Sequence, residues 1–220
     1  VWVSEDGGLT WESTALDWAP YMGRTLTRII VNPEDPDTLL TASSVGVYRS
    51  TNGGTSWSLT LNGDIASLEI DPSNSNHILA GSFGNVIAES HDAGASWSTQ
   101  YLDGNSFGIS RIAVAFSPSA PDTVYAIAGK ASNQGFRGIW RSTDGGSSWE
   151  ARLQEGDGPN LFGWTVEGID TGGQAWYDLC LAVDPTDPDI LFAGGVNLWT
   201  SSDGGNEWTC AGHWYAGGER

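Results

Sequence analysis

Basic residues are scarce in this chain, which has 9 Lys and Arg residues against 27 Asp and Glu residues in 220 positions. The formal net charge at pH 7 is therefore −18. A surface this acidic repels phosphate backbones, so nucleic-acid binding is excluded as a function class. Such a surface fits a soluble extracellular protein and is compatible with bound Ca²⁺, but no calcium motif is present and no cofactor is predicted.

Residues that build covalent or metal-bound frameworks are also few. The 2 cysteines, Cys180 and Cys210, do not form a disulfide framework, and one bridge or two free thiols are both open. The 3 histidines, His77, His91 and His213, show no metal-ligand spacing, so the sequence predicts no metal site.

Long hydrophobic runs and helical periodicity are absent as well. The apolar runs are only a few residues long, which predicts no membrane span. No signal peptide is visible, and because the first residues already belong to a repeat, we expect a leader to lie upstream. The lack of a 3.6-residue period excludes a helical solenoid.

One eight-residue phrase occurs five times in a chain with 30 glycines and 12 tryptophans. The copies read SEDGGLTW, STNGGTSW, SHDAGASW, STDGGSSW and SSDGGNEW. Glycine permits positive φ in a tight turn, the acidic side chain accepts backbone hydrogen bonds, and tryptophan can wedge between neighbouring sheets. Because a catalytic site occurs once and not five times, we interpret the phrase as structural. Its residues are Asp6, Trp11, Asn52, Trp57, Asp92, Trp97, Asp144, Trp149, Asp203 and Trp208.

A second phrase, an apolar strand followed by a Pro turn and another apolar strand, precedes the last four copies. A third short strand comes before each eight-residue phrase and a fourth begins at its Trp. The phrases are 46, 40, 52 and 59 residues apart, at positions 6, 52, 92, 144 and 203. Four short antiparallel strands at this period indicate an all-β fold, a β-propeller with one blade per unit.

The predicted ring is incomplete. A blade end at 1–18 is followed by blades at 19–62, 63–103, 104–154 and 155–216, about four and a half blades. We therefore expect a fragment of a longer chain, whose open flanks are covered by the remaining blades or by another chain.

The repeated phrase resembles the Asp-box, or BNR repeat, of sialidases, xyloglucan-active glycoside hydrolases and sortilin-type receptors. Residues 172–209 look similar to secreted Bacteroidota proteins labelled glycosyl hydrolases. The resemblance implies a propeller, an extracellular or cell-surface location and a turn distant from any active site. The Arg-Ile-Pro stretch of sialidases is absent, and no catalytic motif of the xyloglucan-active enzymes can be transferred.

Function is expected on the face opposite the repeated turns, where the connections between strands 2 and 3 and between successive blades lie. Three of these connections are long, at 12–28, 129–138 and 153–178, and long loops on a rigid scaffold commonly bind ligands. Ligand-binding candidates are the aromatic and basic residues Trp18, Tyr21, Phe136, Arg137, Trp164, Trp176 and Tyr177.

Acidic residues on the same loops keep an enzymatic alternative open. A glycosidase needs two carboxylates flanking the scissile bond, and Glu167 with Asp170, or Asp157 with Asp178, could supply them. The leading hypothesis is a secreted binding or scaffold module that recognises a glycan or a protein. The alternatives are a glycoside hydrolase of xyloglucanase-like or sialidase-like type and a structural part of an extracellular assembly.

Overall fold

The computed structural model describes residues 1–16, 23–104 and 108–215, and the regular secondary structure within them is almost entirely β-strand. The one helix among them is the four-residue α1 (Ala175–Asp178). Two residues predicted to bind ligand, Trp18 and Tyr21, lie outside the described residues.

The strands form one two-stranded and four four-stranded sheets in which each strand pairs with the next one along the chain. The small sheet contains β1 (Trp2–Val3) and β2 (Glu12–Ser13). The first large sheet contains β3 (Leu26–Val31), β4 (Leu39–Ser43), β5 (Gly46–Ser50) and β6 (Ser58–Asn62). The second contains β7 (Ile65–Asp71), β8 (Asn74–Ser82), β9 (Val86–Ser90) and β10 (Ser98–Tyr101). The third contains β11 (Ile109–Phe116), β12 (Val124–Lys130), β13 (Phe136–Ser142) and β14 (Glu150–Gln154). The fourth contains β15 (Cys180–Val183), β16 (Leu191–Gly194), β17 (Leu198–Ser201) and β18 (Thr209–Gly212). This architecture confirms the predicted all-β fold of four-stranded antiparallel units.

Burial explains why the strand sequences differ within a sheet. Residues 124–129 of β12 are buried on both faces, and the sequence there, VYAIAG, is continuously apolar or small. The last strand of each large sheet is more exposed than the second strand of the same sheet, and β10, with the sequence STQY, has no buried residue. A strand covered on both faces needs apolar residues throughout, whereas an outer strand does not. The apolar pattern therefore locates the second strand in the core and the fourth at the rim.

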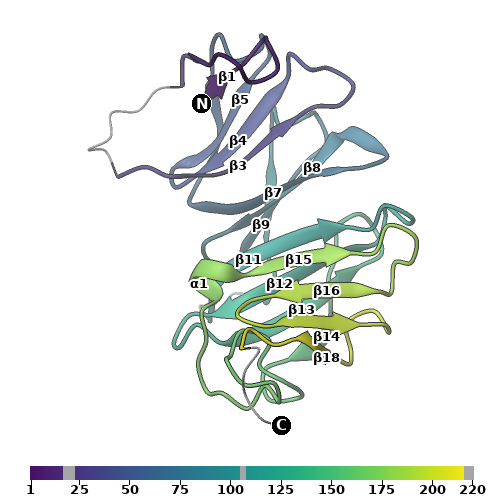
Figure 1. The fold of residues 1–220 in the computed structure, drawn as a ribbon. Coiled ribbons are helices and arrows are strands. Elements are labelled where there is room, and N and C mark those ends of the chain that lie inside the picture. Colours follow the sequence, from purple (N-terminus) through teal and green to yellow (C-terminus); the bar gives the residue numbers. More distant parts are fainter. Residues whose placement is uncertain (17–22, 105–107, 216–220) are drawn as a thin grey trace. The chain divides into compact units, whose positions relative to one another are not determined.

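The chain divides into two compact units, and each has its own core (Figure 1). Unit 1 comprises Val1–Ala80 and Ala88–Ser98, and unit 2 comprises Gly81–Ile87 and Thr99–Arg220. In unit 1, β3 contacts β7, and the core includes Leu40, Leu68 and Ile78. In unit 2, β11 contacts β15, and the core includes Tyr125, Phe162 and Trp199.

The five repeated phrases form turns with one hydrogen-bond pattern. The first serine accepts a bond of 2.7–3.0 Å from the amide of the residue four positions later, which is always a glycine. The Asp or Asn side chain accepts a bond of 2.8–3.0 Å from the amide four positions beyond it. Asn52 makes this contact at 2.9 Å as Asp92 does at 2.8 Å, so the turn needs an acceptor and not a charge. Two adjacent residues in each turn have positive φ, and Ala93, at +54°, replaces glycine once.

Four of the five tryptophans that end these turns hydrogen-bond to nearby backbone or to the neighbouring sheet, and the indole nitrogen of Trp149 is buried without a partner among the described residues. The indole Nε1 atoms of Trp11, Trp57 and Trp208 donate to a glycine carbonyl of their own turn at 3.0–3.1 Å. Trp97 instead donates at 3.2 Å to Oγ1 of Thr60 on β6 of the adjacent sheet. These contacts give the repeated residues a role in local structure. A binding site is therefore expected elsewhere in the chain.

Candidate functional site

The long connection 155–179 of unit 2 folds against the connection between β12 and β13. Asn160 joins them, because its amide nitrogen donates to the carbonyls of Asp170 and Gly172, both at 2.9 Å. Its side-chain oxygen accepts from the amides of Phe136 at 2.8 Å and Phe162 at 3.2 Å. All the hydrogen-bonding positions of one side chain are used, so the two connections form a single ordered surface.

Two adjoining pockets lie on this surface. The first, of about 350 Å³, lies between residues 130–136 and 155–171, and its lining includes Asn133, Pro159 and Asp170. The second, of about 580 Å³, includes Ala131 and Arg137. Lys130 and Glu155 line both pockets and form an ion pair with each other, and Arg137 pairs with Asp103. The basic side chains that line the two pockets are therefore both paired with carboxylates.

The acids that the sequence offered as catalytic pairs have different surroundings in the structure. Asp170 lines the first pocket, whereas Glu167 lines a third hollow that shares only Gly158, Pro159 and Gly168 with it. Asp157 is exposed, and Asp178 lies at the end of α1.

The environments of Asp170 and Asp178 push their pKa values in opposite directions. Burial would raise the pKa of Asp170, but hydrogen bonds from Thr165 and Trp164 outweigh burial and lower it. Those bonds, of 2.7–2.8 Å to Oδ2, use the carboxylate to hold the loop. Burial raises the pKa of Asp178 in spite of the nearby Arg111, and its Oδ1 is buried without a hydrogen-bond partner.

Phe136, predicted to bind ligand from an exposed loop, lines the first pocket but is almost completely buried. Only 4% of it is exposed, and it lies in the core of unit 2 with its ring 6.0 Å from that of Phe162. Its amide is held by Asn160, so the first residue of β13 turns inward. Arg137, the next residue, is only partly buried and lines the second pocket.

Trp176 and Tyr177 form an exposed aromatic pair on α1. Their exposed fractions are 58% and 70%, and their ring centroids are 5.3 Å apart. Arg111 fixes the helix by donating from Nη1 to the carbonyls of Ala175, Trp176 and Tyr177 at 3.2–3.4 Å. A Cβ at Gly129 would lie 2.3 Å from that of Ala175, so glycine is required where α1 rests on β12.

Residues 213–215 form a second exposed aromatic group. They are not among the ligand-binding residues predicted from the sequence. The indole Nε1 of Trp214 donates to the carbonyl of Trp164 at 3.2 Å, and its ring lies 5.6 Å from that of Tyr215. His213 approaches the same carbonyl at 3.0 Å, and Asn197 accepts from the Trp214 amide at 3.3 Å. In the sequence, the run of three aromatic residues HWY at 213–215 could have indicated this group.

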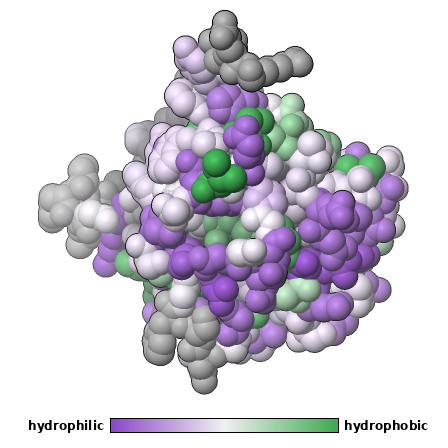
Figure 2. All heavy atoms as spheres, turned by 90° about the horizontal axis from the view of Figure 1, so that it is seen from below, coloured by the Kyte–Doolittle hydropathy of each residue, from purple (hydrophilic) through white to green (hydrophobic). Residues whose placement is uncertain are grey.

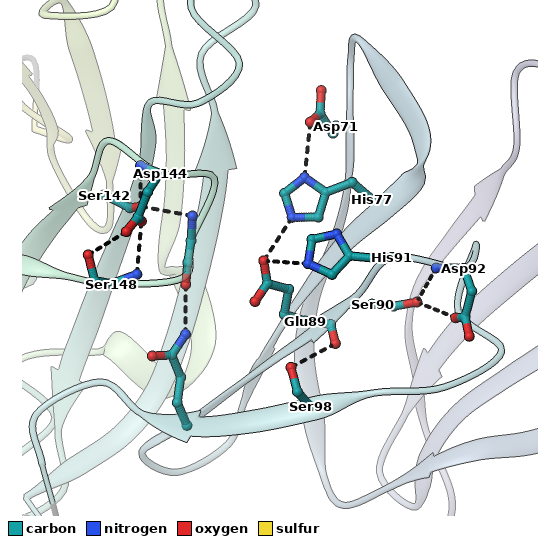
Figure 3. A network of polar contacts seen from close by, with 12 residues as sticks. Asp71, His77, Glu89, Ser90, His91, Asp92, Ser98, Ser142, Asp144 and Ser148 are labelled. Atoms are coloured by element: carbon teal, nitrogen blue, oxygen red, sulfur yellow. Dashed lines mark hydrogen bonds and ion pairs between the residues drawn. The ribbon is translucent and has the colours of Figure 1, made fainter.

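Unit 1 contains the one group of described His, Cys, Asp and Glu residues that could hold a metal ion, namely His77, Glu89 and His91 (Figure 3). We call these three residues the histidine cluster. The sequence predicts no metal site here, because the three positions match no short ligand motif.

Comparison with known proteins supports the fold. No family model matches the chain. A curated relative, Xyloglucanase Xgh74A of Acetivibrio thermocellus, is 34% identical over 109 residues, covering 47% of this chain and 12% of the relative. An ancestral GH74 enzyme aligns with a TM-score of 0.65 at 20% identity, over 84% of this chain and 25% of that one. YCF48 bound to D1 peptide aligns with a TM-score of 0.57 at 21% identity, over 96% of this chain and 60% of that one. The chain has a β-propeller fold.

The comparisons also show how much of these proteins the chain represents. It spans about an eighth of the curated xyloglucanase and a quarter of the GH74 structure, which carry more than the blades described above. The identities to the solved structures, 20% and 21%, establish the fold alone. Within the described residues, no helix is long and apolar enough to cross a membrane.

Proposed function

We propose that this propeller segment is an extracellular glycan-binding module, and that its ligand is a β-linked polysaccharide of the xyloglucan class. The observation that carries the proposal is the exposed Trp176–Tyr177 pair, which Arg111 anchors through three backbone carbonyls. Rigid aromatic faces bind apolar ligand surfaces with little loss of conformational entropy, and one face of a sugar ring is such a surface.

The loop surface to which α1 belongs also supports a sugar ligand. The two pockets on the loop surface are lined by amide, charged and glycine residues that can hydrogen-bond to hydroxyl groups. Figure 2 shows a face of the molecule on which hydrophilic residues predominate and hydrophobic residues form small separate groups. The similarity over 109 residues to a xyloglucanase selects the polysaccharide class to be tested first.

The test is binding of the purified chain to soluble xyloglucan, measured by isothermal titration calorimetry. W176A combined with Y177A should lower the affinity at least about 10-fold, in the range of a lost aromatic binding hot spot. W2A is the matched control, because Trp2 is 64% exposed but lies on β1 of unit 1. Equal affinities of the double variant and the wild type would contradict the proposal, as would absence of xyloglucan binding.

Hydrolysis is the second candidate function, because the curated relative is a xyloglucanase and Asp178 has the raised pKa that a general acid needs. The test measures new reducing ends from xyloglucan. Activity that disappears in D178N supports the assignment, and activity that survives D178N, E167Q and D170N contradicts it.

We also propose that further blades, or another chain, cover the open apolar strand surface in the complete protein. Ile29 and Val31 point to the same side of β3 and are 50% and 53% exposed. Protection of these positions from hydroxyl-radical labelling in a longer native chain, and not in this one, is the expected result.

A further inference from the structure

The histidine cluster is assembled from two neighbouring strands and a turn of unit 1. His77 lies on β8, Glu89 on β9 and His91 in the turn after β9. Oε1 of Glu89 lies 3.2 Å from Nε2 of His77 and 3.1 Å from Nε2 of His91. The two imidazole rings are stacked, with centroids 4.8 Å apart and planes inclined by 12°. Both rings thus present Nε2 to the same carboxylate oxygen (Figure 3).

A second carboxylate orients the buried histidine. Oδ2 of Asp71 lies 3.0 Å from Nδ1 of His77. Oδ1 of Asp71 accepts bonds from the amide and hydroxyl of Ser73 at 2.7 and 2.8 Å, which fix the carboxylate in the turn after β7. A carboxylate on one imidazole nitrogen, with the other nitrogen aimed at a ligand set, is the arrangement that surrounds histidines bound to metals. Asp71 is therefore a positioning residue for His77.

The repeat shows that this residue set is not part of the ordinary blade. Aligned on the turn proline and the turn serine, the other three large sheets carry different residues at the positions of His77, Glu89 and His91. These are Thr38, Arg49 and Thr51, then Thr123, Arg141 and Thr143, then Ile190, Thr200 and Ser202. Because those three sheets form the same turn without the cluster, the blade itself does not require these residues.

We propose that the histidine cluster binds one divalent transition-metal ion of the Zn²⁺ class through His77 Nε2, Glu89 Oε1 and His91 Nε2. Two imidazoles and one carboxylate suit Zn²⁺, whereas Ca²⁺ and Mg²⁺ prefer oxygen ligands.

The distances between the ligand atoms fit a tetrahedral ion. Metal bonds of about 2.0–2.2 Å place ligand atoms about 3.4 Å apart in this geometry. The two oxygen–nitrogen separations, 3.1 and 3.2 Å, are close to this spacing, and all the ligand atoms lie within 4.8 Å of one another.

The ligand residues of the cluster differ in burial, so two are held by packing and the third is at the surface. The side chains of His77 and Glu89 are 7% and 10% exposed, so the packed sheet holds them in place. The side chain of His91 is 66% exposed, which leaves it free to close onto the ion and opens the fourth coordination position to water. Three protein ligands with one open position is the arrangement of zinc sites that accept a further ligand.

The probe is Zn²⁺ alone, titrated into the metal-free full chain by calorimetry, with bound zinc counted by mass spectrometry. We expect one Zn²⁺ per chain. H91T uses the residue that two other sheets carry at this position and should weaken binding at least about 10-fold. D71N uses the residue of the first large sheet, Asn32, and should weaken binding about 10-fold to 100-fold. Thermal melts of both variants should show a cooperative transition, which checks that they fold.

H213A is the matched control, since His213 is exposed and belongs to unit 2. Its zinc affinity should equal that of the wild type. Substitution with Co²⁺ should give the visible absorption of a four-coordinate or five-coordinate site in the wild type and not in H91T. Binding of less than one Zn²⁺ per chain, or equal zinc affinity of H91T and the wild type, would overturn the proposal. Zinc and xyloglucan are separate probes on separate units, so either proposal can fail alone.

Discussion

We predict that the side chain of Asn160 keeps the loop surface of unit 2 ordered. N160A removes the acceptor of two amides, those of Phe136 and Phe162, and the donor to two carbonyls. Each amide left without a partner costs about 1–3 kcal/mol, and each lost bond to an accessible carbonyl costs less, because water replaces it. Since both phenylalanines are buried, we expect unit 2 to lose about 2–6 kcal/mol.

The assay is native-state hydrogen exchange, because it reports on each amide and separates unit 2 from unit 1. The amides of Phe136 and Phe162 should lose protection in N160A, while N62A, at an exposed position of β6, should leave it unchanged. N160D keeps the two acceptor bonds but turns a carboxylate toward the carbonyls of Asp170 and Gly172. It should therefore also be destabilised at pH 7 and partly recover as the pH falls. Undiminished protection of both amides in N160A would refute the reasoning.

Three further predictions follow from buried or hydrogen-bonded groups. Hydrogen bonds, first of all from Thr10 to Asp6 and from Ser96 to Asp92, lower the pKa of each carboxyl to about 2 from 3.8. Thermal melts should therefore show stability lost as the pH falls from about 4 to about 2, and D92N should reduce that loss. F136A should lower the free energy of unfolding in urea by about 3–5 kcal/mol, because it leaves a core cavity. A variant that loses ligand binding but unfolds like the wild type would contradict the burial of Phe136. Burial raises the folded-state pKa of Asp178, so stability falls as the pH rises through that value, and melting of D178N should lack this fall.

The propeller could be predicted because its signals are local. In each repeated turn, the serine and the Asp or Asn side chain accept bonds from amides four residues away, so a pattern of eight letters records the complete turn. The strand pattern is equally local, because a strand buried on both faces, such as β12, is apolar throughout. Sequence spacing could therefore establish the kind of sheet and the order of the strands.

The site could not be predicted to the same degree, because it depends on contacts between distant residues. Phe136 is buried beside Phe162, and Asn160, 24 positions later, holds its amide. Trp176 and Tyr177 are presented by Arg111, which lies 65 and 66 positions from the carbonyls it binds. The acids illustrate the same limit, since Asp170 and Glu167 are three positions apart and line different hollows.

The histidine cluster shows what a repeat can reveal once the ordinary unit is known. At the position of Glu89, two other sheets have arginines that reach the next sheet, with Arg49 bound to the carbonyl of Ala93 at 2.8 Å and Arg141 paired with Asp189 at 3.0 Å. Glu89 reverses this charge at a position that is only 9% exposed. A buried carboxylate is costly unless donors or a cation compensate it. His77 and His91 compensate the carboxylate of Glu89 within the same sheet. The same two imidazoles are ligands that a transition metal needs. Departures from a repeat that compensate one another in this way are stronger indicators of a site than any single unusual residue.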